Sequence, residues 1–420
     1  MHSFLRTYRI AAAVLCAMLF FVPEVRASDE SPEAQKELTV AERNAAQGFN
    51  DTIDRLAPDF VTVSLVVAEP GAVLYTVLGH ACLRLQCPSF GLDYIFSYES
   101  ENVRGKVFRF LIDDLKMGIT MMAPEDYVQT YIEEGRGVKS YTLNLPPEVK
   151  MELWRMCDEG VEQEMHLQYD PVKRGCAISV LHVVEDAVKS VNRQTGKNYA
   201  IGYSVWGTKG RRTIREIFYE NAAKGWGLFW CMTIVAGRYV DNPHIPTKEK
   251  LIAPFELVER WQNATIDGKA IISQQPVELS PSVKKYQGEW FSPFCFSLLI
   301  LALSLLNLCF GNNYLTYVLL GLYAVFSLFI TYMLVFPSLP NTDWNWLIIP
   351  FNILPVLFWH WRRYWALPYA IIILVWCLAM IAEFYWGHVL VYWPHIILAL
   401  SFFVVLVKQS SMLAQLRCKK

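Results

Sequence analysis

The carboxyl-terminal third of the chain is almost free of charged residues, and this constrains the fold more than any other feature. Five apolar segments follow Trp290 with short connections, at about residues 291–311, 314–336, 345–360, 366–386 and 389–408. A bilayer core requires about 20 helical residues, a length that four segments reach; the third is short and contains Pro350 and Pro355. Five such segments leave no solvated face for a soluble core. We therefore predict an all-α domain of five transmembrane helices at residues 289–410.

The positions of lysine and arginine predict the orientation of this domain. If residues 28–288 lie outside, five crossings bring residues 361–365 and the carboxyl terminus inside. Basic residues occur at those places, namely Arg362, Arg363, Lys408, Arg417, Lys419 and Lys420, and the outer turn at residues 337–344 has none. This bias predicts a bacterial inner-membrane protein with a periplasmic N-terminal domain and a cytoplasmic tail at residues 411–420. Membrane lipids are its expected partners.

Three polar side chains fall within the apolar segments close to the predicted outer boundary: Asn352, Glu383 and His395. Polar groups are costly in a bilayer and often mark a function. One interpretation is a polar cluster beneath the exported domain. The alternative, in which Glu383 and His395 only reach the headgroup region, stays open.

The first 27 residues have the pattern of a secretory signal peptide. Arg6 and Arg9 precede the apolar run "IAAAVLCAMLFFV", and the small residue Ala27 comes just before Ser28. We expect cleavage after Ala27 and export of residues 28–288. The net charge of −1 gives no indication of a nucleic-acid partner.

The order of strand-like and helical segments in the exported part predicts an α+β domain. Strand-like segments dominate residues 61–145, namely "VTVSLVV", "HACLRL", "DYIFSY", "KVFRFLI" and "KSYTLNL". Helices are expected near residues 124–134, over residues 146–165 and from Cys176 onward. Side chains of a strand alternate, so one face of "HACLRL" carries Ala81, Leu83 and Leu85 toward the core and the other carries His80, Cys82 and Arg84.

The exported part holds five cysteines, an odd number that leaves at least one thiol unpaired within the molecule: Cys82, Cys87, Cys157, Cys176 and Cys231. Cys176 follows a loop with Pro and Gly and opens an amphipathic helix. Free backbone amides and the helix dipole at that position lower the pKa of a thiol. His182 lies on another face of the same helix, and His166 has no positional support, so His80 is the candidate partner.

Simpler interpretations of these residues stay open. A cysteine at a helix start is commonly a small buried residue or half of a disulfide, and a histidine beside a glycine is commonly a turn residue. No CxxC or HExxH spacing occurs, so we expect no metal site, and we expect no cofactor.

Several strings resemble the Lnb-type N-terminal periplasmic domain: "VSLVVAEPGAVLYTVLGHACLRL", "SYTLNLPPE" and "QYDPVKRGC". The five-segment tail resembles the Lnb-like transmembrane domain that accompanies it in some members. The family name comes from a maturation partner of a secreted lacto-N-biosidase, which implies a chaperone-like role. The order of histidine on a strand and later cysteine at a helix start is also similar to circularly permuted papain-like folds, such as the lecithin retinol acyltransferase group.

The chain departs from the family pattern near the histidine. The strand that often reads "YNYG" is here "FSYE", residues 96–99, so Ser97 takes the place of the family's Asn. The residue that orients the imidazole is therefore open, with Ser97, Tyr94, Tyr98 and Glu99 as candidates.

Two functions are compatible with these features. The first is a membrane-anchored periplasmic hydrolase or acyl or peptidyl transferase in which Cys176 is the nucleophile and His80 the base, acting on a lipid, lipoprotein or peptide of the envelope. The alternative is a non-enzymatic chaperone or maturation factor for a secreted or envelope client protein.

Overall fold

A computed structural model of the chain describes residues 57, 59–71, 76–100, 116–163, 167–170, 172–204, 212–221, 236–283, 293–311, 313–335 and 344–410. These residues form two compact units. One holds the described residues up to Asn221 and from Pro243 to residue 283; the other holds residues 236–242 and those from Pro293 onward. The predicted signal peptide, the strand at residues 106–112, the tail at residues 411–420 and the junction at residue 288 lie outside the described residues.

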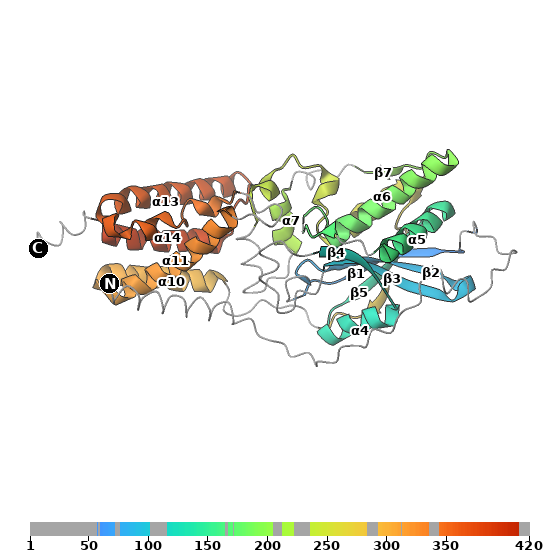
Figure 1. Ribbon diagram of the computed structural model, residues 1–420, viewed down its shortest axis with the longest axis horizontal. Coiled ribbons are helices and arrows are strands. Elements are labelled where there is room, and N and C mark those ends of the chain that lie inside the picture. Colours follow the sequence, from blue (N-terminus) through green and yellow to red (C-terminus); the bar gives the residue numbers. More distant parts are fainter. Residues whose placement is uncertain are drawn as a thin grey trace, which may run out of the picture. The chain divides into compact units, whose positions relative to one another are not determined.

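The described part of the first unit contains a seven-stranded antiparallel sheet in the order β10-β5-β1-β2-β3-β4-β6 (Figure 1). Its strands are β1 (Thr62–Ala68), β2 (His80–Cys87), β3 (Leu92–Ser100), β4 (Lys116–Met122), β5 (Val138–Thr142), β6 (Leu167–Gln168) and β10 (Val277–Ser280). Strands β1, β2, β3 and β5 lie where the alternating apolar pattern predicts them. A smaller sheet joins β7 (Ile201–Tyr203), β8 (Ala264–Ile266) and β9 (Lys269–Ala270).

Helices cover both faces of the large sheet. Helices α5 (Pro147–Glu162) and α6 (Cys176–Thr195) pack on one face, and α4 (Pro124–Glu134) packs on the other (Figure 1). The face of β2 that carries His80 is therefore also part of a core, because Cys82 is buried against Tyr127 and Tyr131 of α4. The mixed sheet and helix domain is confirmed, with both sheet faces covered. The unit also contains α7 (Ile214–Asn221) and α9 (Pro254–Gln262).

The second unit is helical, with α10 (Pro293–Phe310), α11 (Asn313–Val335), α13 (Arg362–Tyr385) and α14 (Trp393–Gln409). Three stretches of the described residues are long and apolar enough to cross a membrane: Pro293–Phe310, Asn313–Val335 and Trp359–Tyr385. The fourth apolar helix, α14, is shorter. Four of the five predicted segments are thus helices.

The segment between α11 and α13 differs from the predicted third helix. Its described residues, 344–361, form only short helices, at Trp346–Ile348, Leu354–Leu357 and Trp359–Trp361. Proline removes a backbone donor and clashes with the preceding helical turn, which explains why Pro350 and Pro355 interrupt a continuous helix. The prediction of a helix at residues 345–360 is wrong, and the five-helix count is not confirmed.

This broken segment nevertheless returns the chain along the bundle. Nζ of Lys408 in α14 donates to Asn307 of α10 at 2.7 Å and to Thr316 of α11 at 2.8 Å. Nε of Arg362 in α13 donates to Gln409 at 3.3 Å. The end of α10, the start of α11, the start of α13 and the end of α14 therefore lie together. Because 23 residues of α11 extend for about 34 Å, the chain must return over that distance before α13 begins.

Candidate functional site

A tight turn delivers His80 to the first position of β2. The amide of Gly79 donates to the carbonyl of Thr76 at 2.8 Å, and Gly79 has a φ of 86°. A Cβ at Gly79 would lie 2.5 Å from the carbonyl oxygen of Ala68, the residue that pairs with His80 across β1 and β2. Only glycine fits this backbone, which accounts for the sequence "GH" at the head of the strand.

The loop before α6 fixes Cys176 at the first position of that helix. Oδ1 of the buried Asp170 accepts the amides of Val172 and Lys173, each at 2.9 Å, and its carbonyl accepts the amide of Arg174 at 2.9 Å. Gly175 is the N-cap of α6. The carboxylate of Asp170 thus stabilises the loop. Cys176 lies at the amino end of α6, where the backbone amides of the first helical turn have no partner within the helix.

The structure brings Cys176 and His80 together, although they are far apart in the sequence. The thiol and the imidazole lie close enough for each to shift the pKa of the other, and the backbone amides of Ala81 and Ala177 also act on the thiol. Burial alone raises the pKa of the Cys176 thiol, but the imidazole and the two amides outweigh it, so the pKa is lowered. Burial lowers the pKa of His80, yet the charge and hydrogen bond of Cys176, together with Glu99, leave it raised.

These opposite directions favour a thiolate beside an imidazolium. The other described cysteines of this unit behave differently. Cys82, Cys87 and Cys157 are buried free thiols, and burial raises the pKa of each. Cys176 is a free thiol that is partly exposed. Cys231, the fifth cysteine of the predicted exported part, lies outside the described residues.

Two of the four candidate orienting residues reach the imidazole. Oγ of Ser97 lies 2.6 Å from Nε2 of His80, and Oε1 of Glu99 lies 3.9 Å from the same nitrogen. Tyr94 pairs with Leu85 and belongs to the opposite face of the sheet. Tyr98 is also on that face, where Cys157 of α5 and Asp186 of α6 contribute with burial to a raised pKa. Neither tyrosine is positioned to orient His80.

Two residues near the site were not found by sequence reasoning. The ring of Tyr127 in α4 lies 6.4 Å from that of His80. Arg136 follows α4 directly, and its positive charge opposes protonation of His80. Tyr127 belongs to the buried face of a helix that the sequence predicts, so the sequence could have indicated that it is buried. Nothing in the local sequence of Arg136 marks it, because its position depends on the path of the chain after Gly135.

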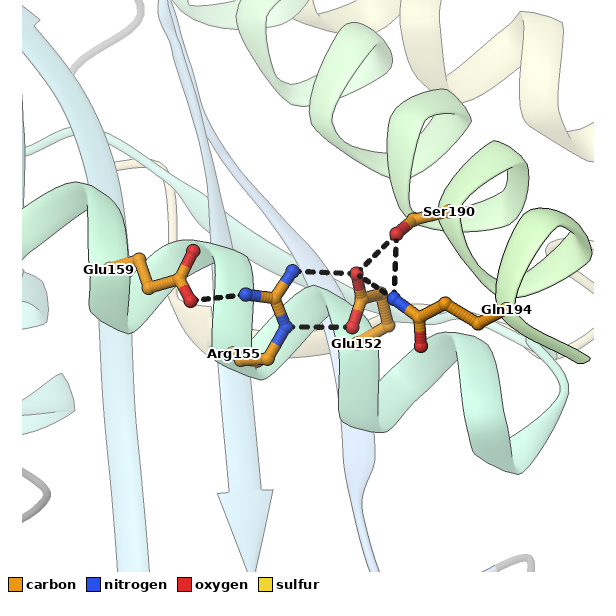
Figure 2. A network of polar contacts seen from close by, with 5 residues as sticks. All are labelled: Glu152, Arg155, Glu159, Ser190 and Gln194. Carbon is orange, nitrogen blue, oxygen red and sulfur yellow. Dashed lines mark hydrogen bonds and ion pairs between the residues drawn. The ribbon is translucent and has the colours of Figure 1, made fainter.

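A polar network holds α6 against α5, as Figure 2 shows. Oε1 of Glu152 accepts the hydroxyl of Ser190 at 2.6 Å, Nε2 of Gln194 at 3.3 Å and Nη2 of Arg155 at 2.7 Å. Oε2 of Glu152 accepts Nε of Arg155 at 2.8 Å. Arg155 also pairs with Glu159. This network joins α5 to the later turns of α6, well beyond Cys176 at the start of that helix.

The predicted polar cluster in the apolar segments takes a different form. Nδ2 of Asn352 donates to the hydroxyl of Tyr369 at 2.7 Å and to nearby backbone carbonyls. The buried ring of His395 lies 6.2 Å from those of Phe326 and Tyr392. These contacts do not include Glu383. Asn352 therefore stabilises the broken segment, where backbone groups need partners inside the bundle.

Metal binding has no support in the described ranges, where no group of three or more His, Cys, Asp or Glu side chains is placed to hold an ion. The described part of the site therefore offers a thiol, an imidazole, a hydroxyl and a carboxylate, together with backbone amides at the sulfur. This set of groups suits nucleophilic and acid–base chemistry.

Residues 49–209 match the family model of the Lnb N-terminal periplasmic domain. The match spans His80, Ser97, Glu99 and Cys176 and confirms the resemblance over that region. Comparison with curated proteins and with solved structures found no match. The likeness to permuted papain-like folds therefore stays a prediction. The family match and the apolar helices are those of a membrane protein with a periplasmic N-terminal domain.

Proposed function

We propose that the protein is a thiol-dependent hydrolase or acyl or peptidyl transferase that acts on an envelope substrate at the outer face of the membrane. The observation that carries the proposal is the pairing of Cys176 with His80, in which each group shifts the pKa of the other, so that the thiol has a lowered pKa and the imidazole a raised one. Opposite shifts of this kind are typical of an activated cysteine nucleophile.

The first half of the reaction forms a thioester. The Cys176 thiolate attacks the carbonyl carbon of an ester, thioester or amide, a C–S bond forms, and the carbonyl electrons move to oxygen. The backbone amides of Ala81 and Ala177 help to lower the pKa of the thiol, and main-chain amides at this helix start are the donors that we propose for the oxyanion. When the tetrahedral intermediate collapses, the bond to the leaving group breaks, and the leaving group takes a proton from the His80 imidazolium.

The second half regenerates the thiolate. Neutral His80 removes a proton from water, in a hydrolase, or from an amine or hydroxyl acceptor, in a transferase. The resulting nucleophile attacks the thioester carbon, the C–S bond breaks, and Cys176 leaves as a thiolate beside the reformed imidazolium. Ser97, at 2.6 Å from Nε2, holds the ring in place through both steps.

The membrane unit supports an envelope substrate such as a lipid, a lipoprotein or an envelope peptide. We propose insertion in the inner membrane with the carboxyl terminus in the cytoplasm. Arg362 and Lys408 lie at the same end of the helical bundle, in keeping with the positive-inside rule. Lipid-linked substrates of the envelope would then be on the same side of the membrane as the periplasmic unit.

The proposal is tested with p-nitrophenyl acetate and the full chain in detergent. We expect a burst of p-nitrophenolate with one acetyl group on Cys176, located by mass spectrometry. Cys176→Ala abolishes the burst. The matched control is Cys295→Ser, because Cys295 is an exposed thiol outside the site, and this variant keeps the burst. A burst that survives in Cys176→Ala, or no burst from the wild type, would overturn the enzymatic proposal in favour of a binding role toward a client protein.

A further inference from the structure

Nε2 of His80 faces two side chains of β3 that differ in character. Cys82 pairs with Ser97 in the antiparallel ladder, so continuing the register by two residues places His80 opposite Glu99, on the same face of the sheet. The contacts agree with this register, at 2.6 Å to Oγ of Ser97 and 3.9 Å to Oε1 of Glu99.

Ser97 and Glu99 offer the imidazole different interactions. Ser97 is fully buried, and its hydroxyl can direct the ring but carries no net charge. The side chain of Glu99 is 36% exposed, while that of His80 is 14% exposed. A carboxylate at this distance stabilises the protonated imidazole by charge, without the geometry of a direct hydrogen bond.

The other groups that face His80 come from two helices and from the turn after α4. Cys176 of α6 carries the negative charge of the pair, and Tyr127 of α4 presents its ring. Arg136, after α4, opposes the imidazolium, although Nη1 of Arg136 pairs with Glu134 at 2.7 Å. Within the described part of the chain, Glu99 is the carboxylate that lies within ion-pair distance of His80.

We propose that Glu99 is a positioning residue that maintains the charge of the His80 imidazolium, while Ser97 maintains the orientation of the ring. This inference rests on the proposed function, because it concerns the same Cys–His pair. A single carboxylate could both orient the imidazole through a hydrogen bond and stabilise its charge. Here Ser97 orients the ring and Glu99 stabilises the charge. Neutralising Glu99 therefore changes the pH range in which the pair is charged.

The test is the pH profile of Cys176 alkylation by iodoacetamide in the detergent-solubilised full chain, quantified on the Cys176 peptide. The rate changes once when the thiolate forms and again, at higher pH, when the imidazolium loses its proton. Glu99→Gln removes the stabilising charge and lowers the second midpoint by about half to one pH unit. Glu99→Asp keeps the charge and restores at least half of that shift.

The matched control is Glu278→Gln, which removes the same charge from exposed Glu278 on β10, at the far edge of the sheet. We expect both midpoints to stay at their wild-type values. Because Glu99 is partly exposed, 1 M salt, where the Debye length is about 3 Å, lowers the second midpoint of the wild type and has less effect on Glu99→Gln.

Two results would overturn the inference in different ways. If the wild type shows two midpoints and Glu99→Gln behaves like Glu278→Gln, the role of Glu99 is wrong and the proposed function stands. If the wild type shows one midpoint that His80→Ala does not move, the Cys–His pair itself is absent and both proposals fail. Should Glu99→Gln fail to fold, Glu99→Asp and the salt dependence of the wild type decide the question.

Discussion

Two polar clusters of the sheet-bearing unit both involve α6, and they differ in how they use their charges. Between α5 and α6, Glu152 of α5 has each carboxylate oxygen occupied by donors from Arg155, Ser190 or Gln194. At the start of α6, Cys176 is partly exposed, and its lowered pKa depends on His80 and two amides. The first cluster joins two helices, and the second leaves a charged sulfur accessible.

The first cluster therefore has a structural role, and the second a chemical one. A buried carboxylate whose acceptor sites are filled contributes stability and has no capacity left for a substrate. A thiolate held by an imidazole remains nucleophilic, and Cys176 is partly exposed. Substitutions in the two clusters should therefore affect different measurements: stability for Glu152, and thiol reactivity for Cys176.

The largest effect is expected from Gly79→Ala, which disturbs the turn that delivers His80. The new Cβ would meet the carbonyl of Ala68 at 2.5 Å with a φ of 86°. We expect a loss of about 3 kcal/mol in the free energy of unfolding, measured by urea unfolding of the full chain in detergent. Gly91→Ala is the matched control, because φ at Gly91 is 65° and its Cβ would meet nothing within 4 Å. Equal losses in the two variants would contradict the steric argument.

Glu152→Ala should destabilise the unit and leave the site chemistry unchanged. The substitution removes the acceptor that Ser190 and Gln194 share and leaves their donor groups without this hydrogen bond. We expect a cost of about 1–3 kcal/mol in the free energy of unfolding. Because hydrogen bonds from Arg155 lower the pKa of Glu152, this contribution is present near neutral pH and is lost as the pH falls through that lowered pKa. Urea unfolding at several pH values measures it.

The comparison variant for Glu152 is Glu159→Ala, which removes the exposed partner of Arg155 and should cost less than about 1 kcal/mol. Iodoacetamide labelling of Cys176 should keep its midpoint in both variants. A changed midpoint in Glu152→Ala would show that the two clusters are not separable.

Asp170→Ala should have a smaller effect on stability and a selective effect on the site. The amides of Val172 and Lys173 lose their acceptor, at about 1 kcal/mol, and the loop no longer fixes Cys176 beside His80. We expect the labelling midpoint of Cys176 to rise toward that of a free thiol. Asp170→Asn keeps an acceptor oxygen and should retain most of the wild-type behaviour; the same rise in both variants would argue against this role.

The smallest effect is expected from Tyr98→Phe. The Tyr98 side chain lies on the sheet face opposite His80, so loss of its hydroxyl should leave the labelling profile of Cys176 unchanged. Ser97→Ala, one residue away, removes the 2.6 Å contact with Nε2 and should raise the labelling midpoint. A rise in Tyr98→Phe would mean that the assignment of strand faces is wrong.

The sequence predicted the elements of the site because their patterns are local. Gly79 marks the turn before His80, and the apolar stripe after Cys176 marks a helix start. The choice among four orienting residues depended on the register of β2 against β3, which no local pattern specifies. Strand β4 was missed because "KMGITMM" lacks the alternation of its neighbours and forms by pairing with β3. The broken segment contains prolines that were visible, but its path depends on packing against Tyr323 and Tyr369.

The most direct test of the account is the pH midpoint of iodoacetamide labelling at Cys176 in the full chain, for the wild type and His80→Ala. A lowered pKa means that the thiolate forms at lower pH, so we expect a wild-type midpoint below the value of about 8.5 for a free cysteine. In His80→Ala burial is no longer outweighed by the imidazole, and the midpoint should rise. A wild-type midpoint at or above about 8.5 that does not respond to His80→Ala would contradict the account.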